Sequence, residues 1–269
     1  MSRVPILCYH AVRETPLPGL DPFSLTPAGF EAHLDLLVER GWRTQRVTDF
    51  VRDHVRGSAP IPERTILITF DDGYADFVEV AVPMLVERGL DATLFVTTST
   101  VGTTPRFLDP VPSDGTIMAS WEQLRTIDAA TIELGAHGHV HADLDVLTPA
   151  EAAADIQRSR ALLEEGLDRP VTSFAYPRGY HGGSVRRLVD EAGFVAGCAV
   201  RNLVSHAGDD PLALARILVR NDHDTTWLAS LLDGDGPDSA TPRELIRTKG
   251  WRAVRRAKRR LGHRSARTA

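Results

Sequence analysis

The sequence is poor in cysteine and has no long hydrophobic run. Its 269 residues include two cysteines, Cys8 and Cys198, and each stands inside a short apolar segment. Buried thiols of this kind commonly serve as small core side chains, and two of them do not build a disulfide framework. No apolar run approaches the roughly 20 residues that a transmembrane helix needs. We therefore expect neither a disulfide-stabilised fold nor a membrane-spanning one.

A targeting segment is not recognisable either. The chain passes from Met1 almost directly into Val4–His10, which is too short for the apolar region of a signal peptide. Hydrophobic residues make up 42% and charged residues 25% of the chain, as in ordinary globular domains. We expect a cytoplasmic protein that folds as one large α/β domain or two small ones.

Acidic residues are missing from the C-terminal end of the chain. None follows Glu244, whereas ten lysines and arginines do, so residues 1–244 hold 21 basic groups against all 36 acidic ones. The formal net charge of −15 on this part, against −5 for the whole chain, argues against a nucleic-acid-binding surface. Between Trp251 and Leu261, apolar residues recur at helical spacing among Arg and Lys. This end of the chain is either a helix that lies on an anionic membrane or a solvated tail.

Short apolar runs alternate with well-delimited helical patterns. Thr26 and Pro27 are typical of a helix start, and Gly41 of a helix end. The other helix signals are capping boxes at Ser120–Gln123 and Thr148–Glu151 and C-terminal stops at Gly89 and Gly166.

The apolar runs between these helices are candidate strands. An order of strand, helix, strand repeated this often predicts a mostly parallel sheet. About seven such units favour a closed α/β barrel over an open sheet. The strands that we expect are Pro5–Tyr9, Thr65–Phe70, Ala92–Val96, Ile132–Leu134, Val171–Ala175, Gly197–Val200 and Ile217–Arg220.

Two adjacent carboxylates follow one of the expected strands. Asp71 and Asp72 come directly after Thr65–Phe70, and Gly73 then allows the chain to turn. Neighbouring side chains of an extended strand point to opposite faces, but the backbone angles open to glycine let both carboxylates approach one pocket. A helix cap would need only one carboxylate. We interpret the pair as part of a functional site at the C-terminal end of the strand.

Three histidines within five residues follow another expected strand. His137, His139 and His141 come after Ile132–Leu134, and the neighbouring glycines favour a loop over a helix. One histidine often belongs to a core, but that explanation does not account for three. Neutral imidazoles together with one carboxylate form a common site for zinc or a similar divalent ion. Asp72 is the carboxylate that we expect to complete such a site.

At these residues the chain resembles the polysaccharide deacetylase family. Thr69–Gly73 is similar to the first signature of the family, and His137–His141 to its second, a His-(Ser/Thr)-x-x-His motif. Pro5–His10 and Phe174–Gly179 also resemble family motifs, in the usual order. The resemblance covers roughly residues 4 to 232 and implies a distorted (β/α) barrel of about seven strands. We accordingly assign residues 1–240 to a catalytic domain and residues 241–269 to a basic C-terminal tail.

The resemblance also implies roles for individual residues. Asp72, His137 and His141 would bind one divalent metal ion, zinc in the first place, with Co, Ni or Mn as alternatives. Asp71 would then act as the general base on a water molecule.

Further candidates lie outside these two motifs. His223 follows the last expected strand and would be the general acid, with His206 as its rival. His10, Tyr176 and Arg178 are the candidate substrate-binding residues.

Two positions depart from the family pattern. Gly138 replaces the Ser or Thr that often supports the second motif, so His137 would be held differently. Ala175 stands where the third motif commonly carries an arginine that orients the catalytic aspartate. Arg178 could substitute for that arginine, or could bind a phosphate or carboxylate of the substrate.

The function that the resemblance implies is hydrolysis of an N-acetyl group on a hexosamine-containing glycan or glycan precursor. Because no export signal is recognisable, we expect an intracellular lipid- or nucleotide-linked intermediate as the substrate rather than a finished wall polymer. Two alternatives stay open. The same metal site could cleave a non-sugar amide or a cyclic imide, or the protein could be a catalytically inactive carbohydrate-binding relative that has lost the motif-three arginine.

Overall fold

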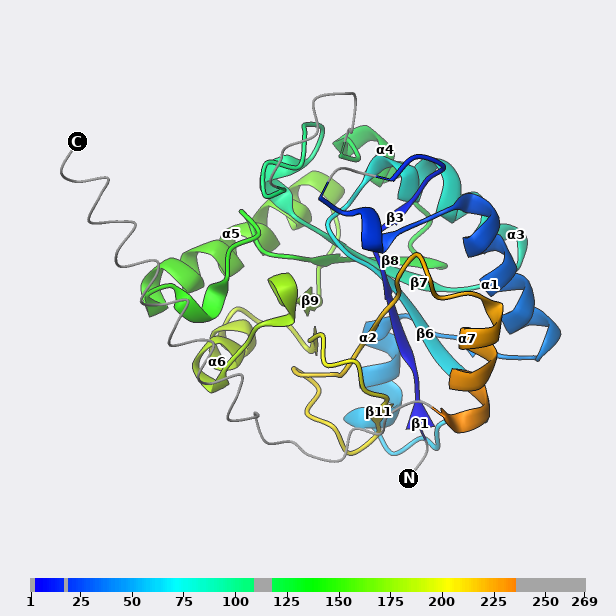
Figure 1. Cartoon of the computed structure of the whole chain (residues 1–269). Helices are drawn as coiled ribbons and strands as arrows, with labels where there is room; N and C mark the ends of the chain where they lie inside the picture. Colours follow the sequence, from blue (N-terminus) through cyan, green and yellow to red (C-terminus); the bar gives the residue numbers. More distant parts are fainter. Residues whose placement is uncertain (1–2, 17–18, 109–117, 236–269) are drawn as a thin grey trace.

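The computed structural model describes residues 3–16, 19–108 and 118–235. Its main element is a curled sheet whose strands follow the order β10-β9-β8-β7-β6-β2-β12, with the short strand β5 also paired to β6. Every pairing in this sheet is parallel. The sheet forms a half-barrel, and helices surround its outer side (Figure 1). The expected (β/α) barrel architecture of about seven strands is confirmed.

The strands lie close to their predicted positions. β6 and β7 have the predicted bounds, whereas the last three strands of the sheet are shorter than expected. The sheet consists of β2 (Ile6–Tyr9), β5 (Arg43–Thr44), β6 (Thr65–Phe70), β7 (Ala92–Val96), β8 (Ile132–Ala136), β9 (Ser173–Ala175), β10 (Ala196–Cys198) and β12 (Ile217–Leu218). Two further pairs are β1 (Arg3–Val4) with β11 (Ser205–His206), and β3 (Ala11–Val12) with β4 (Ser24–Leu25).

Three α-helices begin where the sequence signals place them. Thr26 caps α1, and both predicted capping boxes are formed, at the starts of α4 and α5. The helices are α1 (Pro27–Glu39), α2 (Val47–Phe50), α3 (Val82–Glu87), α4 (Trp121–Thr126), α5 (Pro149–Leu167), α6 (Gly183–Glu191) and α7 (Thr225–Ser230). Single turns of other helix types cover Asp21–Phe23, Val51–Val55, Phe77–Ala81, Thr98–Thr100, Leu144–Val146, Pro177–Gly179 and Leu231–Asp235.

The predicted stop at Gly166 is wrong. Helix α5 continues through it to Leu167, and Asp168 ends the helix in the left-handed conformation, with φ of 51°. A Cβ atom on Gly166 would lie 2.4 Å from the ring of Trp121. Glycine is needed there because α4 packs closely against α5, and not because the helix ends.

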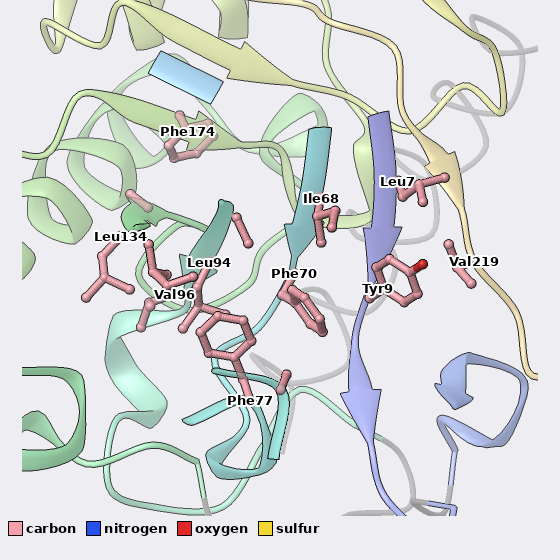
Figure 2. Close-up of a cluster of buried hydrophobic side chains, with 14 of the residues drawn as sticks. Leu7, Tyr9, Ile68, Phe70, Phe77, Leu94, Val96, Leu134, Phe174 and Val219 are labelled. Atoms are coloured by element: carbon pink, nitrogen blue, oxygen red, sulfur yellow. The ribbon is translucent and has the colours of Figure 1, made fainter. Parts of the chain in front are cut away.

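Two apolar layers enclose the sheet. The outer layer lies between the strands and the surrounding helices, and Leu7, Tyr9, Ile68 and Phe70 belong to it (Figure 2). The alternate residues of the same strands point to the inner side, where Ile6 and Leu67 join the second apolar cluster. This alternation directs Cys8, His10, Thr69 and Asp71 into the barrel interior as well, because successive side chains of a strand point to opposite faces.

The segment before β12 closes the gap between the two ends of the sheet. Leu214 exchanges backbone hydrogen bonds with Gly197 and Ala199, both 2.8 Å long, and the carbonyl of Arg216 accepts from the amide of Asn202 at 2.9 Å. The chain then pairs with β2 as β12. Arg216 therefore lies at the seam of the barrel.

Among the residues that the structure describes, none of the helices combines the length and apolar composition that crossing a membrane requires.

Candidate metal and catalytic site

Asp71 and Asp72 lie directly beyond the C-terminal end of β6, and both side chains are buried. Asp72 has φ of 75° and Gly73 has φ of 94°, so two successive residues take positive angles. This turn brings both carboxylates to one histidine. Nε2 of His137 lies 3.8 Å from Oδ2 of Asp71 and 3.5 Å from Oδ1 of Asp72. The predicted convergence of the two carboxylates is therefore observed, and Asp72 itself adopts the unusual backbone angle together with Gly73.

Asp72, His137 and His141 form a group with the geometry of a metal site. One donor atom from each lies within 4.8 Å of the others, and Nε2 of His141 is 3.3 Å from Oδ1 of Asp72. Within the described residues, Oδ1 of Asp72 and Nδ1 of His141 are buried and have no hydrogen-bond partner. An unsatisfied buried carboxylate oxygen is costly, and a cation bound next to Oδ1 of Asp72 would satisfy it. One carboxylate and two imidazoles therefore fit a divalent ion such as zinc.

Neighbouring backbone and side-chain groups orient this group. Nδ1 of His137 donates to the carbonyl of Ala175 at 2.9 Å, which leaves its Nε2 lone pair directed towards Asp72. Burial lowers the pKa of His137 to about 4, against an opposing effect of Asp71, so the imidazole is neutral at neutral pH. The hydroxyl of Tyr74 donates to Oδ2 of Asp72 at 3.1 Å. Phe107 stacks on the ring of His141, with centroids 4.3 Å apart.

The loop between the two histidines is fixed by Asp155 of α5. Its carboxylate accepts from the backbone amides of His139 and Val140, at 2.8 and 3.0 Å. Gly138, with φ of 75°, makes this approach feasible, because a Cβ atom there would lie 2.8 Å from Oδ1 of Asp155. The residue that replaces the usual Ser or Thr thus makes room for a carboxylate from a helix. The side chain of His139 bonds to Thr98 instead, at 2.9 Å.

Arg216 is the cation that holds Asp71. Its guanidinium donates to both oxygens of Asp71, at 2.6 and 2.7 Å, and both side chains are buried. Arg216 also bonds Thr69 Oγ1 and the carbonyl of Ala199, each at 3.2 Å. Burial alone would raise the pKa of Asp71, but the charge of Arg216 outweighs it and lowers the pKa to about 2. Asp71 is therefore ionised throughout the neutral range.

His10 and Cys8 border Asp71 on the side of β2. The thiol of Cys8 donates to Oδ2 of Asp71 at 3.4 Å. Donor atoms of Cys8, His10 and Asp71 lie within 4.8 Å of one another. Nδ1 of His10 is buried and has no hydrogen-bond partner in the described part of the chain. His10, one of the predicted substrate-binding residues, is thus part of the site.

Four other residues proposed from the sequence lie in different surroundings. His223 stacks on Trp227 with centroids 3.9 Å apart, and its Nδ1 accepts from the amide of Arg220 at 3.2 Å. His206 pairs with Arg3 in an antiparallel bridge, at the end of the barrel where the parallel strands begin. The hydroxyl of the buried Tyr176 donates to a backbone carbonyl, that of Leu212. The Nε atom of Arg178 lies 3.3 Å from Asp143, and its side chain is exposed.

Sequence reasoning missed Arg216 and Asp155. A signal existed for Arg216, because it is the one charged residue of the apolar run Leu212–Val219. A buried charge needs a partner of opposite sign, and the two adjacent carboxylates Asp71 and Asp72 were candidates for it. Asp155 had no such signal, since a helix of mixed composition surrounds it.

Comparison with known proteins gives one consistent family. A model of the family described as polysaccharide deacetylase matches residues 58–197. A curated relative named for the same activity, YxkH of Bacillus subtilis (strain 168), is 24% identical over 218 residues, which cover 81% of this chain and 72% of YxkH.

Solved structures agree with this assignment at the level of the fold. IcaB from Ammonifex degensii is 26% identical, with a TM-score of 0.73 over 86% of this chain and 97% of IcaB. The deacetylase PplD of Streptococcus pyogenes, solved in complex with acetate, is 20% identical, with a TM-score of 0.74 over 86% of this chain and 98% of PplD.

Proposed function

This chain belongs to the polysaccharide deacetylase family, and from that premise we propose that it is a metal-dependent hydrolase that removes an N-acetyl group from a hexosamine-containing glycan or glycan precursor. One observation carries the proposal. The Asp72, His137 and His141 group lies beside a separate carboxylate, Asp71, that Arg216 keeps ionised. A hydrolase that activates water needs these two functions next to each other.

The metal ligands in this proposal are Asp72, His137 and His141. Zinc is the first choice because two neutral imidazoles and one carboxylate are usual zinc ligands, and Co, Ni and Mn are alternatives. When bound, such an ion lowers the pKa of a water molecule to about 7 and polarises an acyl carbonyl. The orientation of His137 by Ala175 and of Asp72 by Tyr74 keeps these ligands directed towards the site without a metal.

Asp71 acts as the general base. It accepts a proton from the attacking water while the water oxygen bonds to the acetyl carbon. The carbon–nitrogen bond then breaks, the amine nitrogen takes up a proton, and acetate and the free amine leave. Arg216 keeps Asp71 in place and charged, so that a proton acceptor is present in every cycle.

His10 is the better candidate for the proton donor to the amine. Its imidazole has a nitrogen within 4.8 Å of an Asp71 oxygen. The side chain of His223, in contrast, is stacked on Trp227 and bonded to the backbone amide of Arg220. A proton donor must come within hydrogen-bond reach of the leaving group, directly or through one water. We therefore assign the general acid to His10 in place of His223.

The inactive alternative loses its main support. It depended on the missing arginine of the third motif, and Arg216 provides a guanidinium on Asp71 from the segment before β12. The tail beyond residue 240, which the sequence relates either to an anionic membrane or to solvent, lies outside the described residues.

An acetate-release assay tests the proposal. Metal-free protein is supplied with Zn, Co, Ni or Mn and offered N-acetylated glucosamine oligomers and nucleotide- and lipid-linked N-acetylated sugars. Metal-dependent acetate release from at least one of them is expected. Release from simple amides or cyclic imides alone, or from no substrate with any metal, would contradict the proposed function.

A further inference from the structure

Cys8 lies in β2 and His10 directly follows that strand, so these alternate residues both point into the barrel. The neighbouring strand β6 leads into Asp71, whose amide bonds the carbonyl of Tyr9 at 3.1 Å. This pairing sets a thiol, an imidazole and a carboxylate side by side, with one donor atom of each within 4.8 Å of the others. The group lies outside the Asp72, His137 and His141 set, although Asp71 is adjacent to Asp72 in the chain.

His10, a member of this group, has an unpartnered ring nitrogen. Nδ1 of His10 is buried, and no described residue bonds to it. The Cys8 sulfur contacts Oδ2 of Asp71 at 3.4 Å and is fully buried. Buried polar nitrogen atoms normally have a partner, so one that lacks it indicates a place where an ion or a water fits.

We propose that Cys8, His10 and Asp71 form a second metal site, of lower affinity than the first, which takes a thiophilic divalent ion such as Zn²⁺, Co²⁺ or Cd²⁺. Sulfur, imidazole nitrogen and carboxylate oxygen are all ligands of such ions. On binding, the ion forms a bond to the Cys8 sulfur, and the thiol proton leaves to solvent.

Arg216 explains why this site is the weaker one. Its guanidinium already donates to both oxygens of Asp71, and its positive charge opposes a nearby cation. Asp72 makes no such contact with Arg216 among the hydrogen bonds of the described residues. The first equivalent of metal therefore occupies the Asp72, His137 and His141 group, and the second goes to Cys8, His10 and Asp71.

Occupancy of the second site inhibits hydrolysis. This part of the inference rests on the proposed function, because it assumes that Asp71 accepts a proton and His10 donates one. An ion held between them engages the lone pairs that both steps need. Excess metal is therefore expected to slow the enzyme that one equivalent activates.

Titration of the metal-free, full-length protein with Co²⁺ or Cd²⁺ tests the site itself. Bound metal is measured by equilibrium dialysis, and thiolate ligation by the near-ultraviolet sulfur-to-metal charge-transfer band. In the wild type, the first equivalent is expected to bind without the band and the second with it. Cys8→Ser, which keeps a hydroxyl donor for Asp71, is expected to bind one equivalent and show no band.

Cys198→Ser is the matched control, because Cys198 is the other buried cysteine and stands outside the group. It is expected to behave as the wild type. Because the chain has two cysteines, a charge-transfer band that Cys198→Ser retains must come from the Cys8 sulfur, even if Cys8→Ser does not fold. A wild type that shows no band at saturating metal, or a Cys8→Ser variant that still takes a second equivalent, overturns the site.

Acetate release at one and at two equivalents separates this inference from the proposed function. Each variant is compared with its own rate at one equivalent. Loss of turnover at the second equivalent in the wild type, and not in Cys8→Ser, supports inhibition. If the band appears but no acetate is released at any metal content, the second site stands and the proposed function fails. If the band appears and turnover is unchanged, the inhibitory role is refuted.

Discussion

Arg216 donates two hydrogen bonds to Asp71 across a separation of 145 residues in the chain. The two side chains meet because the segment before β12 closes the barrel beside β2, which itself pairs with β6. In the third motif of the family, an arginine commonly stands at the position of Ala175. Here the backbone carbonyl of Ala175 orients His137 instead. The contact between Arg216 and Asp71 thus supplies the positive charge that the third motif lacks.

Replacing Arg216 with methionine should raise the pKa of Asp71. Burial raises this pKa and Arg216 lowers it to about 2, so burial dominates once the guanidinium is gone. The acid limb of the rate profile should therefore move to higher pH, because Asp71 must be ionised to accept a proton. The pH dependence of kcat/KM for the two proteins measures the shift. An unchanged acid limb would show that Asp71 is not the base.

The same substitution should also reduce stability. Because the folded-state pKa of Asp71 lies below the usual value near 3.9, its ion pair stabilises the fold above that pH and loses this effect as the pH falls towards 2. Removing one partner of a buried ion pair lowers the free energy of unfolding by roughly 3–5 kcal/mol. Denaturant unfolding at neutral pH should therefore show a midpoint at a lower denaturant concentration. Arg178→Met is the control, since Arg178 is exposed and should change stability by less than about 0.5 kcal/mol.

Asp155→Ala should weaken metal binding without removing a ligand. The carboxylate holds the amides of His139 and Val140, so its loss frees the loop that positions both histidines. Loss of an orienting partner typically costs about 10–100-fold in metal affinity. Competition with a chelator measures the dissociation constant. Glu165→Ala, on the exposed side of the same helix, should leave it unchanged. Equal affinity in both variants would contradict the role of Asp155.

His10→Asn should reduce turnover far more than His223→Asn. If His10 protonates the amine, its loss should lower kcat by about 10²–10⁴. His223 contacts Trp227 and Arg220, so its substitution should have little effect on kcat. Acetate release over a range of pH distinguishes the two. A large defect in His223→Asn with a near-normal His10→Asn would restore the assignment that the sequence alone favours.

Gly135→Ala should destabilise the barrel. The added Cβ would lie 2.5 Å from the hydroxyl of Ser173 and 2.6 Å from the ring of Phe95, which fills the interior. Overpacking of this kind typically costs about 1–3 kcal/mol. Gly183→Ala, with no atom within 4 Å of its added Cβ, is the matched control at the start of α6. Thermal unfolding of both variants measures the difference, and equal melting temperatures would contradict the described packing.

Local signals predicted most of the fold. The bounds of β6 and β7 and the capping boxes of α4 and α5 follow from residues that are neighbours in the chain. The stop at Gly166 failed because the reason for that glycine is Trp121, a residue on another helix. Local patterns do not contain such contacts.

The candidate site shows the same division. Asp71, Asp72, His137 and His141 stand in two short motifs, and the structure brings them together as expected. The partners that hold them, Arg216 and Asp155, come from distant segments. His223 was favoured for its place after the last strand, but strand order does not fix the direction of a side chain, and the nearer imidazole is His10.

The most direct test of the account is a comparison of metal content and turnover in Asp71→Asn and Asp72→Asn. Asp72→Asn should lose metal, and added metal should partly restore its activity, because Asp72 is assigned as a ligand. Asp71→Asn should keep one equivalent of metal and lose about 10²–10⁴ in turnover, with no rescue, because an amide cannot accept the proton of water. The opposite pattern of rescue would mean that the two roles are exchanged. Near-normal turnover in Asp71→Asn would contradict the mechanism.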